Sequence, residues 1–535
     1  MAHPEIDLSA PADFNWAYDV VDRWADDPGK LAMRWVGPAG EERDISFATF
    51  RERTNCLANA LTALGLARGD RVFILLPHVV EWWESVLGVM KTGGVAVPGT
   101  SLLTAKDIAY RINAAGARAV ITDSDGAAKL DAVRSGCPSL EWPIIVGPPR
   151  QSWWRYEAMI ALESPVRPRL PTPGGDPCMI YFTSGTTGNP KMVLHTYSYP
   201  IGHRITGASW LGLTPDDLHW NLSDMGWAKA AWSSLFGPWN MGAALYIRYW
   251  RGKYSPRETL EQLQRQPITT FCATPTIYRM LVQEDLRAYQ FPHLRSCTSA
   301  GESLKPDLIE TWRAITGLTI RDGYGQTETI PLCGNLPGQE LRPGSMGKPM
   351  PGLTLAVIDK AGRPLPSGQE GDLAVKVKPH RPVGLFKEYW HDPEVTAASH
   401  RGDWYVTGDR AYVDEDGYFW FVGRADDVII SAGYRIGPFE VEQALLAHPA
   451  VAEAAVVGKP DRTRGAIVKA YVVLASTARP SPSLVHEIQE FVKRSTAPYK
   501  YPREITFVPE LPKTISGRIR RVELRSWAQQ EAEHQ

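Results

Sequence analysis

Strand-length apolar runs alternate with helical apolar patterns over about the first 170 residues of the chain. Residues 47–64 carry apolar side chains at helical spacing, and residues 71–76 form a short apolar run. Residues 80–91 have helical spacing again, and residues 95–98 and 118–122 have strand character. Strands separated by helices of this length are typical of βαβ units, which place parallel strands in one sheet. We therefore predict an α/β fold built on parallel sheets.

The pattern changes twice in the rest of the chain. A stretch rich in Pro and Gly at residues 165–177 indicates a linker, after which the alternation continues to about residue 330. Residues 353–377 form short runs separated by turn residues, which favours a small antiparallel, β-barrel-like piece. Beyond Arg424 the helical and strand patterns are those of a compact α+β unit. At about 100–200 residues per domain, the length suggests three or four folding units.

Bulk composition excludes several classes of protein. The chain has 535 residues, and 58 Lys and Arg against 59 Asp and Glu give a formal charge of −1. A nucleic-acid binder needs a strong basic excess, so we expect no nucleic-acid partner. The six cysteines are scattered without a CxxC pair, which argues against a disulfide framework or a zinc site. Without a signal-peptide pattern or a run of about 18 apolar residues, we expect a cytoplasmic protein with no membrane span.

A loop rich in glycine and hydroxyl side chains follows the apolar strand pattern at residues 178–182. Its glycines let backbone N–H groups approach an anion, its hydroxyls add donors, and its final lysine adds a positive charge. A Walker A loop is excluded because two residues separate Gly188 from Lys191 and because Met192 follows the lysine. We therefore predict a phosphate-binding loop of another type rather than a polar surface turn. Its residues are Thr183, Ser184, Gly185, Thr186, Thr187, Gly188, Asn189, Pro190 and Lys191.

This loop resembles the phosphate loop of the adenylate-forming superfamily, which includes acyl-CoA synthetases, luciferase-like enzymes and the adenylation domains of peptide synthetases. Residues 322–328 resemble the family's adenine- and acid-binding segment. Tyr324 offers a flat face for the base, and Glu328 is a hard oxygen ligand suited to Mg²⁺. A dinucleotide fingerprint is poorly supported because Glu328 occupies its third glycine position. The resemblance also assigns to ATP binding Gly301, Glu302, Ser303, Asp322, Gly323, Gly325, Gln326 and Thr327.

Three further positions resemble family motifs around the change of pattern. The resemblance implies that Asp409 binds the ribose hydroxyls and that Arg424 contacts the ribose or a phosphate. It makes Asp426 the hinge about which a small, mobile C-terminal domain rotates between two half-reactions. We therefore predict an N-terminal adenylate-forming domain at residues 1–425 and a mobile domain at residues 426–535.

The acceptor and the acid are assigned by resemblance alone. Residues 432–435 resemble the segment that lines the pantetheine channel, although Arg464 and Lys500 could equally be solvated surface charges. The expected CoA-binding residues are Ala432, Gly433, Tyr434, Arg435, Arg464 and Lys500. Near the acid we expect Trp227, Lys229 and Trp232, and for Trp232 a role in the core is the alternative. Residues 77–83, 224–227, 322–328 and 497–502 most resemble the medium-chain acyl-CoA synthetase branch, which implies a small or medium-chain monocarboxylic acid that is straight, branched or aromatic.

One residue departs from the family pattern. Residues 511–518 resemble the C-terminal catalytic motif, but Arg518 stands where the family has a lysine that reaches the α-phosphate and the carboxylate. Arginine keeps the charge in a bulkier, planar group. Three interpretations stay open: a natural variant that works, an engineered change that slows adenylation, or a chain that binds ligands without adenylating.

The resemblance implies a two-step reaction with ATP, Mg²⁺ and coenzyme A. The acid is activated as an acyl-adenylate with loss of pyrophosphate, and the thiol of CoA then displaces AMP. The expected catalytic residues are Lys191, Glu328 and Arg518, with Glu328 as the metal ligand. The alternatives are an adenylating enzyme that uses a carrier-protein thiol or an amine, and an adenylation-impaired protein that binds a nucleotide or CoA. The sequence is compatible with a homo-oligomer.

Overall fold

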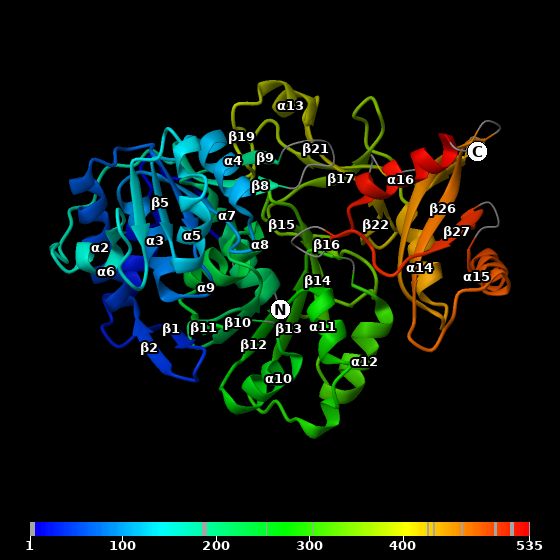
Figure 1. Ribbon diagram of the computed structural model, residues 1–535, viewed down its shortest axis with the longest axis horizontal. Coiled ribbons are helices and arrows are strands. Elements are labelled where there is room, and N and C mark those ends of the chain that lie inside the picture. Colours follow the sequence, from blue (N-terminus) through cyan, green and yellow to red (C-terminus); the bar gives the residue numbers. More distant parts are fainter. Residues whose placement is uncertain are drawn as a thin grey trace. The chain divides into compact units, whose positions relative to one another are not determined.

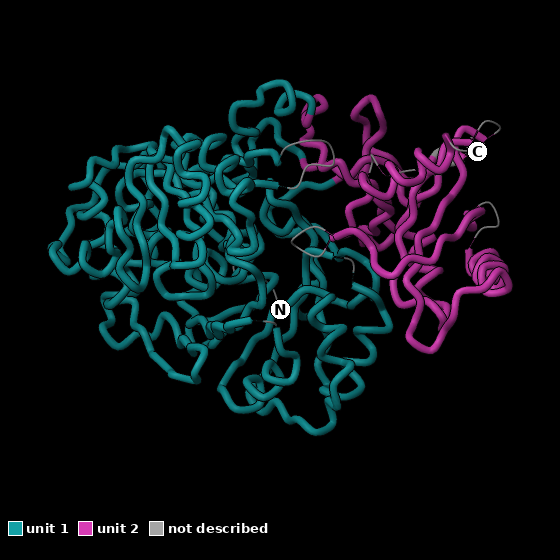
Figure 2. The backbone as a smooth tube through the Cα atoms, viewed as in Figure 1, with its two compact units in different colours: residues 1–183, 190–355, 376–398 teal, residues 184–189, 356–375, 399–535 magenta. Residues whose placement is uncertain are grey.

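The computed structural model of the protein describes residues 6–183, 190–252, 254–302, 304–424, 427, 429–431, 434–461, 464–496, 500–513 and 518–533. Within these ranges the chain forms two compact units (Figures 1 and 2). The first unit comprises residues 6–183, 190–355 and 376–398, and the second comprises residues 356–375 and 399–533. The predicted boundary at Asp426 stays a prediction, because residues 425 and 426 lie outside the described residues.

Two large sheets form the framework of the first unit. One has the order β19 (Glu388–Tyr389), β9 (Lys191–Thr196), β8 (Pro177–Thr183), β4 (Val95–Pro98), β3 (Arg71–Leu75), β5 (Ala119–Thr122), β6 (Trp142–Ile145), β7 (Trp154–Arg155). The other has the order β16 (Lys348–Pro349), β15 (Pro331–Gly334), β14 (Ile320–Gly325), β13 (Ser296–Ala300), β12 (Thr270–Ala273), β10 (Leu218–Leu222), β11 (Ala244–Arg248), β1 (Leu31–Val36), β2 (Glu42–Ser46).

The central strands of both sheets are parallel, which confirms the predicted α/β fold. β4, β3, β5 and β6 pair in parallel in the first sheet, and β11, β10, β12, β13 and β14 do so in the second. Antiparallel strands extend the edges: β9 and β19 follow β8, and β15 and β16 follow β14. The carboxyl ends of parallel strands lie at one edge of a sheet, where α/β proteins commonly bind ligands.

Helices cover the sheets of the first unit. Local signals set their ends: Ser46 caps α2 by accepting from the N–H of Thr49, and Gly65 ends it at φ 102°. The α-helices and π-helices of this unit are η1 (Ala17–Val21), α1 (Asp22–Trp24), α2 (Phe47–Leu64), α3 (Val80–Lys91), α4 (Ala105–Ala115), α5 (Ser124–Asp131), α6 (Tyr156–Ile160), α7 (Tyr199–Ile205), η3 (Thr206–Leu211), α8 (Ala228–Ala231), η4 (Trp232–Phe236), α9 (Gly237–Asn240), α10 (Pro256–Arg265), α11 (Pro275–Leu281), α12 (Pro306–Thr316), α13 (Pro393–Ala398).

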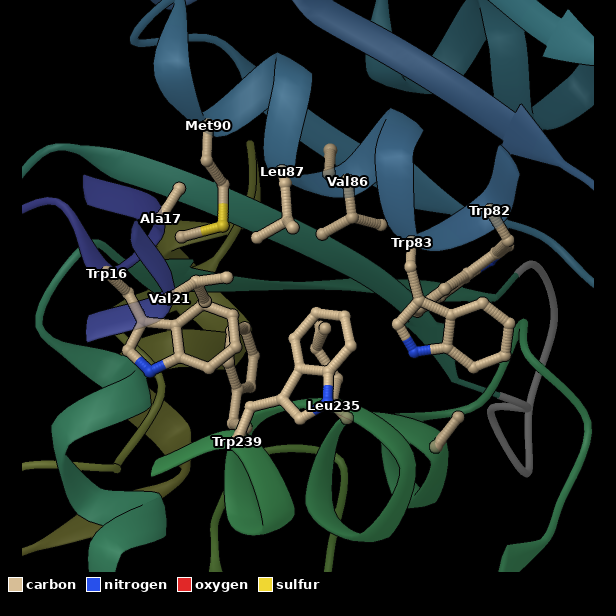
Figure 3. Packing of buried hydrophobic residues seen from close by; sticks show 14 of the residues in the cluster. Trp16, Ala17, Val21, Trp82, Trp83, Val86, Leu87, Met90, Leu235 and Trp239 are labelled. Atoms are coloured by element: carbon tan, nitrogen blue, oxygen red, sulfur yellow. The ribbon is translucent and has the colours of Figure 1, made fainter. Parts of the chain in front are cut away.

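The largest core of the first unit lies between the two sheets and is rich in tryptophan (Figure 3). Trp16 and Trp239 stack with ring centroids 6.3 Å apart, and both are fully buried. Each indole N–H is satisfied: Trp16 donates to Asn240 Oδ1 at 2.9 Å, and Trp239 donates to the carbonyl of Ala32 at 3.2 Å. This core joins helices α2, α3 and α9 to both sheets and so fixes the positions of the strand ends.

The second unit is smaller and also mixed. The piece predicted at residues 353–377 corresponds to β17 (Leu355–Ile358) and β18 (Gly371–Lys376). These strands share a sheet with β20 (His400–Arg401), β21 (Trp404–Val413) and β22 (Phe419–Arg424). The predicted α+β unit contains the remaining elements, which are β23 (Ile429–Ser431), β24 (Tyr434–Ile436), α14 (Pro438–Leu446), β25 (Val451–Asp461), β26 (Gly465–Leu474), α15 (Pro482–Ser495), β27 (Glu504–Phe507) and α16 (Arg521–Glu533). None of the helices in the described ranges combines the length and apolar character needed to cross a bilayer.

Truncating Trp239 tests the importance of the tryptophan core. Trp239→Ala removes a ring that packs against Phe47 and Phe50, at centroid distances of 5.4 and 5.0 Å. We expect the free energy of unfolding to fall by about 3–5 kcal/mol, the usual cost of such a cavity, measured by urea denaturation with circular dichroism. Trp154→Ala is the control because that side chain is 48% exposed. Equal losses in the two variants would contradict this account of the core.

Candidate active site

The β8–β9 hairpin fixes the two ends of the predicted phosphate loop. Thr183 is the last residue of β8 and Lys191 the first of β9, and the two are direct partners in the antiparallel ladder. Loop residues Ser184, Gly185, Thr186, Thr187 and Gly188 lie outside the described residues. The Lys191 ammonium group lies 5.0 Å from the ring centroid of Tyr389, a distance at which a cation is attracted to an aromatic face.

Glu328 is held by the same segment that contacts Lys191. The hydroxyl of Tyr389 donates to Glu328 Oε1 at 2.8 Å, and the N–H of Phe386 donates to the Glu328 carbonyl at 2.7 Å. The structure therefore brings together two predicted catalytic residues, Lys191 and Glu328, around Tyr389. No local pattern in the sequence points to Tyr389, because its contacts depend on the pairing of β19 with β9.

Strand β14 carries the predicted adenine-binding segment beside the end of β13. Ser299 pairs with Asp322 and Ala300 with Gly323, so the turn at Gly301 follows at the carboxyl end of both strands. Gly301 has φ 99°, a conformation that favours glycine. Burial raises the pKa of the Asp322 carboxyl well above its usual range.

Several predicted ATP-binding residues already make contacts within the first unit. The Glu302 carboxylate accepts from Thr276 Oγ1 at 2.7 Å and from Arg279 Nη2 at 3.0 Å. The N–H of Gln326 donates to Thr329 Oγ1 at 2.9 Å. Glu302 is thus already engaged by protein groups. Ser303 lies outside the described residues.

The two glycines of β14 face tryptophan rings from the π-helices. A Cβ atom on Gly323 would come within 2.5 Å of the Trp210 indole, and one on Gly325 within 2.7 Å of the Trp232 ring. Only glycine fits against these rings. Trp232 is 4% exposed and belongs to the core, and it also contacts the predicted acid-binding strand. In this position Trp232 can pack in the core and also border the predicted acid-binding site.

A tight turn positions the other predicted substrate residues. The Asp224 carboxylate accepts from Thr100 Oγ1 and from the N–H of Gly226, both at 2.8 Å. Trp227 follows in an extended conformation and is the N-cap residue of α8. The Lys229 ammonium donates to Asn221 Oδ1 at 3.3 Å, and Lys229 Cδ is 3.9 Å from where a Cβ of Gly301 would lie. Lys229 therefore lies near the turn that follows β13.

The second unit brings together the predicted ribose-binding pair. Asp409 on β21 is the ladder partner of Arg424 on β22, and Arg424 Nη1 lies 3.1 Å from Asp409 Oδ1. Asp409 is buried, and its N–H donates to Thr407 Oγ1 at 3.2 Å. The predicted hinge, Asp426, lies outside the described residues.

The predicted CoA-binding residues do not form one described cluster. Ala432 and Gly433 lie outside the described residues, and Tyr434 and Arg435 lie on β24, which pairs with β23. The N–H of Arg464 donates to Asp461 Oδ1 at 2.8 Å, and Lys500 pairs with Glu440 at 2.5 Å. The assignment of these residues to CoA binding stays a prediction.

Arg518, the predicted catalytic residue of the second unit, is exposed, and its role stays a prediction.

The turn at Gly226 can be tested because its backbone passes very close to a neighbouring segment. A Cβ on Gly226 would lie 2.1 Å from the backbone nitrogen of Thr100, so Gly226→Ala must push the two segments apart. We expect a loss of about 1–3 kcal/mol in the free energy of unfolding, measured by urea denaturation. Gly136→Ala is the matched control, since nothing lies within 4 Å of its added methyl. A neutral effect of Gly226→Ala would show that this close approach is wrong.

Models of two protein families match the chain. The model described as AMP-binding enzyme matches residues 21–390, and the model described as AMP-binding enzyme C-terminal domain matches residues 440–518. The chain is 48% identical over 532 residues to the mitochondrial acyl-coenzyme A synthetase ACSM3 of Homo sapiens, covering 97% of this chain and 91% of the relative. It is 47% identical over 526 residues to the mitochondrial acyl-coenzyme A synthetase ACSM4 of Rattus norvegicus, covering 96% of this chain and 90% of the relative.

Solved structures resemble the whole fold. The anthranilate CoA ligase AuaEII, in complex with anthranoyl-AMP, matches with a TM-score of 0.88 at 31% identity, covering 98% of this chain and 99% of the other. A benzoate CoA ligase from Burkholderia xenovorans LB400 matches with a TM-score of 0.83 at 30% identity, covering 96% and 100% of the two chains.

Proposed function

The chain belongs to the AMP-binding enzyme family, and from this premise we propose that it is an AMP-forming acid–CoA ligase for a small or medium-chain monocarboxylic acid. The observation that carries the proposal is the 48% identity, over 97% of the chain, to a relative named as an acyl-coenzyme A synthetase. The adenylate-forming superfamily and its medium-chain branch, identified from the motifs, are confirmed by these matches.

The proposed first step forms the acyl-adenylate. A carboxylate oxygen of the acid attacks the α-phosphorus of ATP, and the bond from that phosphorus to the bridging oxygen breaks, so that pyrophosphate leaves with both electrons. Lys191 and Arg518 stabilise the negative charge that develops on the phosphates. Tyr324 stacks on the adenine, and Asp409 accepts hydrogen bonds from the ribose hydroxyls.

Glu328 is the proposed ligand for Mg²⁺. A single carboxylate acting together with substrate phosphates is a common way to bind this ion, and the hydrogen bond from Tyr389 to Glu328 Oε1 fits an ionised carboxylate. When bound, Mg²⁺ would neutralise phosphate charge. The protein's own part is to hold the Glu328 side chain in place.

The second proposed step transfers the acyl group. The thiolate of CoA attacks the carbonyl carbon of the adenylate, the bond to the phosphate oxygen breaks, and AMP leaves. CoA enters beside Gly433, and the C-terminal domain rotates about Asp426 between the two steps.

The cytoplasm stays the proposed location. Cell fractionation tests this proposal, because the relatives are named as mitochondrial. A homo-oligomer is tested by light scattering.

Acid-dependent exchange of pyrophosphate into ATP tests the proposed function. We expect exchange with at least one member of a panel of straight, branched and aromatic monocarboxylic acids, and formation of the acyl-CoA thioester when CoA is added. Exchange without a thioester would favour a carrier-protein thiol or an amine as acceptor. ATP binding without exchange on any acid would overturn the ligase proposal and favour a nucleotide-binding protein.

Arg518 can be tested by separating the two steps. Arg518→Ala should lower the exchange rate by about 10²–10³-fold, the usual effect of removing one positioned transition-state donor. Acyl transfer from a preformed acyl-adenylate to CoA should change much less, because we assign Arg518 to the first step alone. Arg518→Lys, which restores the family residue, should stay within about tenfold of the native rate.

The control for Arg518 is Arg520→Ala. Arg520 is 57% exposed and pairs with Glu523 at 2.9 Å, so its loss should leave both steps unchanged. If Arg518→Ala retained full exchange activity, the assignment of Arg518 to the first step would be wrong.

A further inference from the structure

Tyr389 contacts two of the proposed catalytic residues with different parts of one side chain. Its ring faces the Lys191 ammonium at 5.0 Å, and its hydroxyl donates to Glu328 Oε1 at 2.8 Å. The side chain is buried, with 7% of its surface exposed. A rigid phenol with only two side-chain torsions holds its contacts at a fixed separation.

Backbone hydrogen bonds around Tyr389 connect its segment to β9, the strand that begins at Lys191. Tyr389 is the ladder partner of Val193 on β9, and the N–H of Trp390 donates to the carbonyl of Met192 at 2.7 Å. The N–H of Phe386, three residues earlier, donates to the Glu328 carbonyl at 2.7 Å. One short segment, residues 386–390, therefore binds both the strand that begins at Lys191 and the backbone of Glu328.

A second contact joins strand β9 to the segment that contains Glu328. His195, four residues after Lys191 on β9, donates from Nε2 to the carbonyl of Thr327 at 2.8 Å. Its ring stacks on Tyr199 with centroids 3.7 Å apart. Strand β9 thus contacts the Thr327 carbonyl through its own residue His195. It is linked to the Glu328 carboxylate through Tyr389 of the neighbouring strand β19.

We propose that Tyr389 is a positioning residue that sets the distance and orientation between the Lys191 ammonium and the Glu328 carboxylate, so that a phosphate and its metal ion meet both groups at once. This inference rests on the proposed function. The hydroxyl fixes the rotamer of the carboxylate, because a charge-assisted hydrogen bond is short and directional. The ring meanwhile provides a face against which the ammonium lies. Tyr389 itself touches neither ATP nor the acid in this proposal.

The two contacts can be separated by substitution. Tyr389→Phe keeps the ring beside Lys191 and removes the hydrogen bond to Glu328, whereas Tyr389→Leu removes both contacts. Calorimetric titration with ATP, in EDTA and in excess Mg²⁺, gives the factor by which Mg²⁺ changes the dissociation constant. This binding measurement needs neither the acid nor turnover, so it is independent of the rate of the reaction.

We expect Tyr389→Phe to reduce the Mg²⁺ factor by about tenfold, which corresponds to about 1.4 kcal/mol, while the dissociation constant in EDTA stays within about twofold of the native value. Tyr389→Leu should weaken ATP binding in EDTA as well, because Lys191 loses the aromatic face. A residue with only a structural role would weaken binding equally with and without Mg²⁺.

Tyr156→Phe is the matched control. Tyr156 is buried and donates to the Glu84 carboxylate at 2.8 Å, the same kind of bond, but on helix α6 and away from Lys191. It should lose stability without changing the Mg²⁺ factor. Replacement of Tyr389 by 4-aminophenylalanine, which keeps the ring and a donor, should restore the factor to within about threefold of the native value.

The outcomes separate this inference from the proposed function. A native protein that catalyses no exchange with any acid, whether or not it binds ATP, would refute the proposed function. A native protein that does both, with a Mg²⁺ factor unchanged in Tyr389→Phe, would overturn the positioning role alone. If Tyr389→Phe does not fold, the 4-aminophenylalanine variant decides between the outcomes. A Mg²⁺ factor equal to that of the native protein supports the role of the donor, and loss of the Mg²⁺ effect on the dissociation constant refutes it.

Discussion

The pairing of β9 with its two neighbours is the constraint on which the site in the first unit depends. On one side β8 joins β9 through the ladder that ends at Thr183 and Lys191, so the two ends of the predicted phosphate loop are held together. On the other side β19 places Tyr389 next to β9. Both neighbours run antiparallel to β9. The first residue of β9 therefore closes the loop, and its backbone pairs with the segment that carries the contacts to Glu328. A shift of one residue in either ladder would turn these side chains to the opposite face.

The tryptophan rings of the interior explain why β14, the predicted adenine-binding strand, is rich in glycine. Strand β14 passes directly over Trp210 and Trp232, which leave no room for a Cβ at Gly323 or Gly325. The same close approach places the backbone of β14 beside the π-helices η3 and η4, which are frequently found at functional sites. One contact therefore determines both the packing of the core and the glycine content of the predicted binding strand.

Much of the fold was predictable from local patterns. The alternation of residues 47–122 gave parallel strands and covering helices at the predicted places, because periodicity reports which face of an element is buried. The same sequence predicts a phosphate loop, because a run of glycines and hydroxyls after a strand has few other uses. The conformation of residues 184–189 lies outside the described residues, so the details of this loop stay a prediction.

Local sequence determined which groups are candidates for the chemistry: a lysine after a glycine-rich loop, a glutamate after a glycine-rich strand, and an arginine in place of a family lysine. It did not establish that Lys191 and Glu328 share Tyr389, or that Asp409 pairs with Arg424. Tyr389 lies about 200 residues from Lys191 along the chain and carries no chemical signal of its own. Pairing between distant strands decides such contacts, because hydrogen-bond register is set by the packing of whole sheets and is not encoded in any short segment.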